Sequence, residues 1–330
     1  MSSSDPTSMP DLHTGPDEGD GAPAEKQRAA GLSVASNSTL ILLKVIAGTL
    51  TGSVALLTEA VHSSVDLIAS LVAYFSVRKA GEPADETHRY GHERMEDLAA
   101  AIEGVLILVG SAAIAFAAVR RLLTGGHTHT VGLGIAVIAF SAVANLVVSS
   151  VLARRGRTTG SPALAADAAH LRTDALSSGT VLVALVLVAA TGQQWIDPVA
   201  ALLVAGAIVL TGVRLLKGAG QVLVDQALPG QQVSAIREAI ESFGVSHGVV
   251  GYHELRSRSG GSQRYVDVHV QFRSGTSLED AHRTAHELQD VIARALGGAD
   301  VLIHLEPEDR VRPGETLVAP SPGRRRPRRG

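Results

Sequence analysis

The sequence predicts an α-helical membrane protein, in which a bundle of six transmembrane helices precedes a small α+β domain with the element order αββαβ. Two observations support this prediction. Hydrophobic residues make up 45% of the 330 residues, against 18% charged and 3% aromatic residues, and they are concentrated in long runs. Past residue 217 these runs end, and short segments with helical spacing or strand-like alternation replace them.

Six apolar runs account for the predicted transmembrane helices. Each has about 20 residues or more, which is enough for a helix to cross a hydrocarbon core about 30 Å thick. A helix satisfies its own backbone hydrogen bonds and can therefore span lipid. Runs of this length argue against the buried helices of a large soluble protein. The runs occupy residues 30–51, 53–78, 97–123, 131–153, 163–191 and 195–216.

The two ends of the chain are polar. Residues 1–28 are rich in Pro, Gly, Ser and acidic residues and lack the apolar stretch of a signal peptide, so we expect a disordered N-terminal tail. Residues 311–330 contain RRRPRR, which predicts a disordered, solvated basic tail, with attraction to anionic lipid as the alternative. The net charge of −3 gives no indication of a nucleic-acid partner, and none is expected.

Basic residues are distributed unevenly among the predicted loops. The loops between the second and third helices and between the fourth and fifth helices are basic, whereas Arg120 and Arg121 are the basic residues near the opposite face. Because cytoplasmic loops are enriched in Lys and Arg, we expect a multi-pass protein of the cell (inner or plasma) membrane with both termini in the cytoplasm. The basic loop residues are Arg78, Lys79, Arg89, Arg94, Arg154, Arg155 and Arg157.

A cytoplasmic α+β domain is predicted over residues 218–310, after a transmembrane domain at 29–217. VSAIREAIESF has helical spacing, and YHELRSRS and QRYVDVHVQF alternate as strands. SLEDAHRTAHELQDVIARALG and ADVLIHLEP then predict a second helix and a third strand. We expect a ferredoxin-like arrangement with both helices on one face of the sheet, and KGAGQVLVDQALPG as the hinge region.

Two predicted transmembrane helices carry the same arrangement of an acid, a His and a second acid, in EAVHSSVD and DAAHLRTD. Residues three and four apart share a helix face, and ionisable groups inside a membrane are costly enough to indicate a binding or transport function. Two HxxxD pairs supply two imidazoles and two carboxylates, a donor set that suits tetrahedral Zn²⁺. Polar contacts between helices are the alternative, although the repeated spacing argues against them. The predicted ligands are His62, Asp66, His170 and Asp174.

Three stretches resemble the cation diffusion facilitator family of divalent metal exporters: TEAVHSSVDLIAS, PADETHRYGHERMEDLAA and DAAHLRTDALSS. The resemblance runs in order over about residues 29–310. It implies a homodimer with a metallochaperone-like cytoplasmic domain, which exports a transition metal from the cytoplasm in exchange for protons. It also implies that the four predicted ligands form the transport site, because that family uses the corresponding pairs of its second and fifth helices.

The first ligand bears on the identity of the metal. A His at position 62 resembles the zinc-preferring members of the family. Neutral imidazole also favours Zn²⁺, Co²⁺, Ni²⁺ or Fe²⁺ over Mg²⁺, Ca²⁺ or Mn²⁺. We therefore expect Zn²⁺ as the substrate, while Fe²⁺, Co²⁺, Cd²⁺ and Mn²⁺ stay open.

Metal and protons are expected to compete for the transport site, because the imidazoles must be neutral and the carboxylates ionised to bind a metal. Rocking of one helix group against another would give alternating access. We expect the leading acids Glu59 and Asp167 to flank the site as exit and entrance carboxylates. Hydrogen bonding of these acids to the ligand His residues is the alternative.

Further metal sites must use His and carboxylates, because the chain has 13 His and no Cys. Asp85, His88 and His92 lie at spacings of three and four in a loop. They are either solvated polar residues or, as the resemblance implies, a second metal site. The resemblance also implies a binuclear structural or regulatory site in the cytoplasmic domain, with His282 supplied by the neighbouring subunit. Its implied ligands are His253, His269, His282, His304 and Glu306, the last at a position where the family often has Asp.

Arg94 and Asp225 correspond to a basic and an acidic residue that form a salt bridge at the dimer hinge of relatives. An Arg at this place allows a bidentate contact, and an ordinary surface pair is the alternative. An enzyme is not expected, since the metalloprotease motif HExxH is absent. A membrane metal-sensing receptor is the remaining alternative, although it would not need two ionisable pairs deep in the bilayer.

Overall fold

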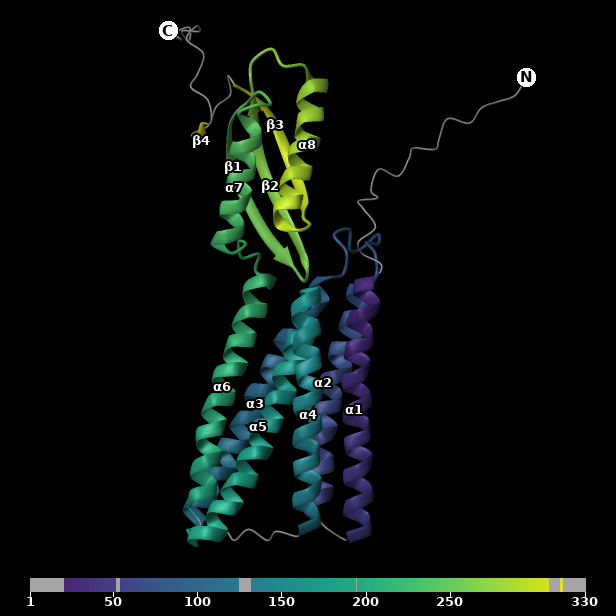
Figure 1. Ribbon diagram of the computed structural model, residues 1–330, viewed down its shortest axis with the longest axis vertical. Helices are drawn as coiled ribbons and strands as arrows, with labels where there is room; N and C mark the ends of the chain where they lie inside the picture. Colours follow the sequence, from purple (N-terminus) through teal and green to yellow (C-terminus); the bar gives the residue numbers. More distant parts are fainter. Residues whose placement is uncertain (1–20, 52–53, 125–131, 194, 309–314, 317–330) are drawn as a thin grey trace, which may run out of the picture.

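A computed structural model describes residues 21–51, 54–124, 132–193, 195–308 and 315–316. Within these ranges, six long helices lie side by side, and an α/β domain stands on one end of the bundle, called here the domain end (Figure 1). This arrangement agrees with the predicted fold class. The bundle helices are α1 (Gly21–Thr51), α2 (Val54–Ala80), α3 (Arg94–Thr124), α4 (Gly132–Thr159), α5 (Pro162–Thr191) and α6 (Ile196–Leu223).

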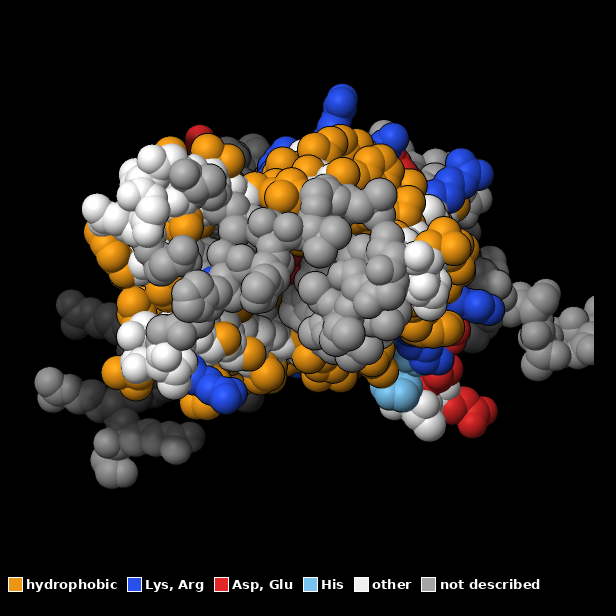
Figure 2. All heavy atoms as spheres, turned by 90° about the horizontal axis from the view of Figure 1, so that it is seen from below, with side chains coloured by type: hydrophobic (Ala, Val, Ile, Leu, Met, Phe, Trp, Pro, Cys, Tyr) orange, Lys and Arg blue, Asp and Glu red, His pale blue; other side chains and the backbone are white. Residues whose placement is uncertain are grey.

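The bundle has the side-chain distribution of a protein that lies in lipid. In the described part of the chain, stretches of α1, α3, α4, α5 and α6 are long and apolar enough to span a membrane. Large apolar side chains such as Phe116 and Leu203 are 71% and 73% exposed. Figure 2 shows hydrophobic side chains around much of the outline of the bundle, seen from the end opposite the domain. The interior instead holds ionisable groups such as Glu103 and Asp167, which indicates a functional interior.

The helices α3 and α6 approach each other closely at two glycines. A Cβ on Gly104 would lie 3.3 Å from the carbonyl oxygen of Gly212 and 3.1 Å from the backbone nitrogen of Leu216. Small residues allow helix backbones to come together in a membrane, where packing replaces the hydrophobic effect as the driving force. This contact fixes the rotation of α3 about its own axis.

Several helix ends differ from the predicted boundaries, and the start of α1 and the end of α6 differ most. α1 begins at Gly21, so residues 21–28 are helical although the sequence predicts a disordered tail there. This segment contains Ala, Glu, Lys and Gln, which favour helix, and its Lys26 forms an ion pair of 2.8 Å with the buried Glu96 of α3. α6 continues to Leu223, inside the expected hinge region.

The α/β domain has the predicted element order. Its elements are α7 (Gly230–Gly244), β1 (Val249–Gly260), β2 (Gln263–Phe272), α8 (Leu278–Leu296) and β3 (Asp300–Pro307). β1 pairs antiparallel with β2, and β2 pairs parallel with β3. As predicted, both helices lie on one side of the sheet (Figure 1) and share a core with it. Members of this core are Ile236, Tyr252, Val268, Leu288 and Ile292.

A short further strand lies within the predicted C-terminal tail. β4 (Glu315–Thr316) pairs antiparallel with β1 at Gly251 and Tyr252, which gives the strand order β3-β2-β1-β4. The edge of β1 presents unpaired backbone N–H and C=O groups, and β4 pairs with some of them. The rest of the predicted C-terminal tail, and residues 1–20 of the N-terminal tail, lie outside the described residues.

Candidate metal centres

Three predicted transport-site residues meet inside the bundle. Asp66 comes from α2, and His170 and Asp174 come from α5. The Nε2 atom of His170 lies 3.5 Å from Oδ1 of Asp66 and 3.7 Å from Oδ2 of Asp174. Asp66 and His170 are 6% and 5% exposed. One imidazole and two carboxylates at these separations could hold a divalent cation, which would compensate the burial of two negative charges.

The fourth predicted ligand, His62, lies in α2 one helical turn before Asp66. Residues four apart share a helix face, so the backbone is compatible with a joint site. The side chains of His62 and Glu59 fall outside the described residues. The roles of these two residues therefore stay predictions.

Asp167 lies on the domain-end side of this cluster. It is completely buried, and its Oδ1 accepts a hydrogen bond of 3.3 Å from the Ser70 hydroxyl of α2. Ser70 lies 2.8 Å from the Ser33 hydroxyl and accepts a bond of 2.7 Å from the Asn37 amide, both of α1. A polar chain thus links three helices between the cluster and the domain end. The described hydrogen bonds of Asp167 go to hydroxyl groups and not to His170.

A further buried acid near the cluster belongs to no motif. Glu103 of α3 is 0% exposed, and neither of its carboxylate oxygens has a hydrogen-bond partner among the described residues. It lies close enough to Asp167, His170 and Asp174 to interact with them electrostatically. In the sequence, the one indication that Glu103 has a function is its position inside an apolar run, LAAAIEGVLILVG.

The loop between α2 and α3 gathers the three residues of the predicted loop site. The Nε2 atom of His92 lies 3.1 Å from Oδ2 of Asp85, and the Nδ1 atom of His88 lies 3.4 Å from Oδ1. The Thr87 hydroxyl and the N–H of His88 donate to Asp85 and hold the pKa of this carboxyl well below its usual range. Asp85 is therefore ionised at neutral pH and, with two neighbouring imidazoles, could hold a divalent ion.

The sheet register aligns three histidines across neighbouring strands. His253 of β1 pairs with His269 of β2, and His269 pairs with His304 of β3. Glu306 lies two residues further along β3 and therefore on the same face as His304. Its Oε2 lies 2.8 Å from His253 Nε2, and its Oε1 lies 3.0 Å from His269 Nδ1. The hydrogen bond with His253, together with that of His269, lowers the pKa of Glu306 to about 2.

Glu254 joins this cluster against the rule of strand alternation. The residue after a His on a regular strand points to the opposite face. Here the register of β1 shifts between His253 and Arg256, and Glu254 has a φ of +50°. The bulge brings Oε2 of Glu254 to 3.5 Å from Nε2 of His269. Nothing in YHELR indicates this shift from the sequence alone.

His282 lies on α8, apart from the row of strand histidines. Its Nε2 is 3.1 Å from Nε2 of His286, one helical turn further on. Among the contacts of the described residues, none joins His282 to His253, His269 or His304 within this protomer. The resemblance assigns His282 to the site of the neighbouring subunit, an arrangement that requires a second chain.

Arg94, at the start of α3, forms an ion pair with Asp225, just after α6. The Arg94 guanidinium lowers the pKa of Asp225, and Arg258 of β1 adds a second contact of 3.2 Å. The guanidinium of Arg258 also lies over the rings of Tyr90 and Tyr265, 5.4 and 4.6 Å from their centroids. Exposed pairs contribute little free energy, so we interpret this group as a positional contact between the bundle and the domain.

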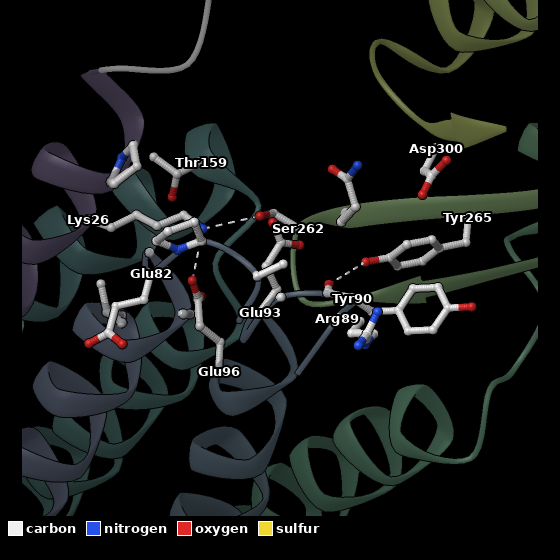
Figure 3. A pocket seen from close by; sticks show the side chains of 18 residues that line it. Lys26, Glu82, Arg89, Tyr90, Glu93, Glu96, Thr159, Ser262, Tyr265 and Asp300 are labelled. Carbon is white, nitrogen blue, oxygen red and sulfur yellow. Dashed lines mark hydrogen bonds and ion pairs between the residues drawn. The ribbon is translucent and has the colours of Figure 1, made fainter. Parts of the chain in front are cut away.

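The tip of the β1–β2 hairpin is docked on the domain end of the bundle (Figure 3). Lys26 of α1 donates to Glu96 of α3 at 2.8 Å and to Ser262 of the hairpin at 3.2 Å. The N–H of Gly261 donates to the carboxylate of Asp97 at 2.7 Å. The contacts of Lys26 border a cavity of about 610 Å³ between the bundle and the domain. The hairpin therefore contacts α3, the helix that carries the buried Glu103.

Both parts of the chain match family models. Residues 31–224 match the cation efflux transmembrane domain, and residues 228–308 match the cytoplasmic domain of cation efflux proteins. The chain belongs to the cation efflux family. This confirms the family that the three motifs resemble, and it makes the chain a multi-pass cation efflux transporter and not an enzyme. The α/β domain is its cytoplasmic domain.

Related cation efflux proteins align with most of the chain. FieF cation-efflux pumps of Citrobacter koseri and Serratia proteamaculans are 33% and 34% identical, over 85% and 84% of this chain and 92% of each relative. The Synechocystis transporter sll1263 is 35% identical over 84% of this chain and 89% of the relative. A solved structure of CzrB in a zinc form is 30% identical and covers 27% of this chain and 99% of that chain, with a TM-score of 0.25.

Proposed function

We propose that this transporter exports Zn²⁺ from the cytoplasm in exchange for protons, by alternating access, as a homodimer in the cell membrane with both termini in the cytoplasm. The buried convergence of Asp66, His170 and Asp174 supports the proposal. With His62 the donor set would be two imidazoles and two carboxylates, which suits tetrahedral Zn²⁺. Fe²⁺, Co²⁺, Cd²⁺ and Mn²⁺ are the alternative substrates.

Proton exchange follows from the chemistry of these ligands. The metal needs a neutral His170 and ionised Asp66 and Asp174, so binding releases protons and protonation expels the metal. Asp167, on the domain-end side, would pass cations from the cytoplasm to the site. Glu59, in the half of α2 away from the domain, would receive them on the way out. The close α3–α6 pair provides one rigid group against which the remaining helices could rock.

The other clusters would bind metal outside the transport step. Asp85, His88 and His92 would form a loop site, and their partly exposed position favours weak, exchangeable binding. His253, His269, His304 and Glu306, with His282 of the partner subunit, would form a structural or regulatory site at the dimer interface. The Arg94–Asp225 ion pair would hold the hinge beside it.

Flux through purified protein in proteoliposomes tests the proposal. We expect Zn²⁺ uptake that is driven by an imposed proton gradient and stops when an ionophore collapses it. Asp66→Asn and His170→Ala should each reduce uptake at least about 100-fold, because even the outer partners of metal ligands contribute about 10–100-fold. His247→Ala is the matched control and should transport normally, because His247 is exposed and belongs to none of the three clusters. Uptake that ignores the proton gradient, or normal uptake by Asp66→Asn protein, would contradict the proposal.

A further inference from the structure

Glu103 is a buried acid that the proposed transport site does not use. Its side chain is 0% exposed, and both carboxylate oxygens lack hydrogen-bond partners among the described residues. A carboxyl group buried without a partner is strongly disfavoured, and more so inside a membrane. If this carboxyl group is ionised, it needs a cation nearby, and the transported metal can supply that charge.

Glu103 lies at the depth of the transport site. α3 starts at Arg94 and α5 starts at Pro162, both at the domain end, so the two helices run in the same direction (Figure 1). With a rise of about 1.5 Å per residue, Glu103 lies about 14 Å and His170 about 12 Å from the starts of their helices. Adjacent helices thus place these two side chains at the same level.

The packing of α3 turns Glu103 toward α5. Ala100 of α3 and Ala166 of α5 belong to one buried cluster. One helical turn further from the domain end, the corresponding residues are Glu103 and His170, because positions three and four apart share a helix face. Gly104 packs on Gly212 of α6 and prevents α3 from rotating away. The electrostatic interaction of Glu103 with His170 and Asp174 agrees with this orientation.

We propose that Glu103 is an additional ligand of the transported metal and determines which metals the site accepts. This inference rests on the proposed transport site. Two imidazoles and two carboxylates already satisfy tetrahedral Zn²⁺. A third carboxylate supplies one or two more oxygen donors, which suit ions such as Mn²⁺ that prefer oxygen ligands and octahedral geometry. Glu103 therefore widens the substrate range beyond Zn²⁺ and is needed least for Zn²⁺ itself.

A metal panel in proteoliposomes measures this selectivity. Glu103→Gln keeps the size of the side chain and removes its charge, and should lower the ratio of kcat/KM for Mn²⁺ to that for Zn²⁺ about tenfold. Glu103→Asp keeps the carboxylate and should retain most of the ratio. Ser111→Ala, a buried residue two turns further along α3 whose hydroxyl bonds its own helix at 2.8 Å, is the matched control. An equal loss for every metal would assign Glu103 a proton-carrying or structural role and overturn the proposal.

The absorption of bound Co²⁺ gives a second readout in the full-length protein. His92→Ala, His253→Ala and His269→Ala together form a background that weakens the other two clusters. Tetrahedral Co²⁺ absorbs visible light much more strongly than five- or six-coordinate Co²⁺, so Glu103→Gln should raise the absorption several-fold. An unchanged spectrum together with unchanged selectivity would refute the proposed role of Glu103 but would not affect the transport site. Normal transport by Asp66→Asn protein would instead refute the transport site on which it rests.

Discussion

Glu306 connects the histidines of three strands. The extra methylene of Glu lets its two oxygens reach His253 and His269 at once, at 2.8 and 3.0 Å. The same oxygen that contacts His269 lies 3.8 Å from His304. A Glu at this position is therefore compatible with a metal site, because the backbone register already brings the three imidazoles into one row.

We expect Glu306→Gln to weaken Zn²⁺ binding by the cytoplasmic cluster about 10–100-fold without changing its pH dependence. The pKa of Glu306 is lowered to about 2, so the carboxylate stays ionised from pH 5 to 8. Titration with Zn²⁺ at several pH values checks this, with His247→Ala as the control, because His247 belongs to none of the three clusters. A flatter pH dependence in Glu306→Gln protein would show that Glu306 itself takes up protons.

Some site residues could be found from the sequence and others could not, for a physical reason. The spacing of Asp66, His170 and Asp174 predicts shared helix faces because the helical period converts sequence distance into direction. Glu103 has no such partner on its own helix, and its significance depends on how α3 packs against α5 and α6. Glu254 depends on a bulge, which strand alternation cannot predict.

At the scale of secondary-structure elements, α3 is held by a backbone contact with α6. We expect Gly104→Ala to destabilise the bundle by roughly 1–3 kcal/mol, since the new methyl group would lie 3.1 Å from the Leu216 nitrogen and an overfilled contact must shift. Gly110 lies in the same helix, and a Cβ there would meet no atom within 4 Å among the described residues. Gly110→Ala is therefore the matched control and should unfold at or slightly above the wild-type temperature, because Ala favours helix more than Gly does. Equal unfolding temperatures for both variants would show that the close contact is not needed.

The type and order of the elements were predictable, and some of their ends were not. Apolar run length and strand alternation indicate which segment is helix or strand. The start of α1 at Gly21 depends instead on the ion pair of Lys26 with Glu96, seventy positions along the chain. β4 depends on the free edge of β1, which exists after the sheet has formed. Residues 21–28 favour helix by composition, but the contacts that define these ends lie far along the chain and cannot be seen in the local sequence.

At the scale of the whole molecule, the cytoplasmic domain is attached to the bundle twice. The chain connects them after α6, and the hairpin tip rests on α1 and α3 through Lys26 and Asp97. Glu96, the acid that pairs with Lys26, also accepts a hydrogen bond from Ser161, which caps the start of α5. A displacement of the hairpin therefore reaches the helix that carries His170 and Asp174.

We expect Gly261→Ala to release this second attachment. Gly261 has a φ of +59°, and a Cβ there would lie 2.6 Å from the carbonyl oxygen of Glu93, so the hairpin tip must move. Gly298→Ala is the matched control, because Gly298 also has a positive φ, of +109°, but a Cβ there meets nothing within 4 Å in the described part of the chain. Gly261→Ala should slow transport several-fold and lengthen the distance between spin labels on the hairpin and α3. Identical behaviour of the two variants would mean that the docking is not coupled to transport.

The row of His253, His269 and His304 also makes the stability of the domain dependent on bound metal. An ion bound there would cross-link β1, β2 and β3, and the unfolded chain does not hold that row together. Binding would therefore add to the free energy of unfolding, by about 2.7 kcal/mol at a free metal concentration of one hundred times Kd. The stability of the sheet would then rise with the concentration of free metal in the cytoplasm. The hairpin that docks on the bundle belongs to this sheet, so its anchoring would depend on the same concentration.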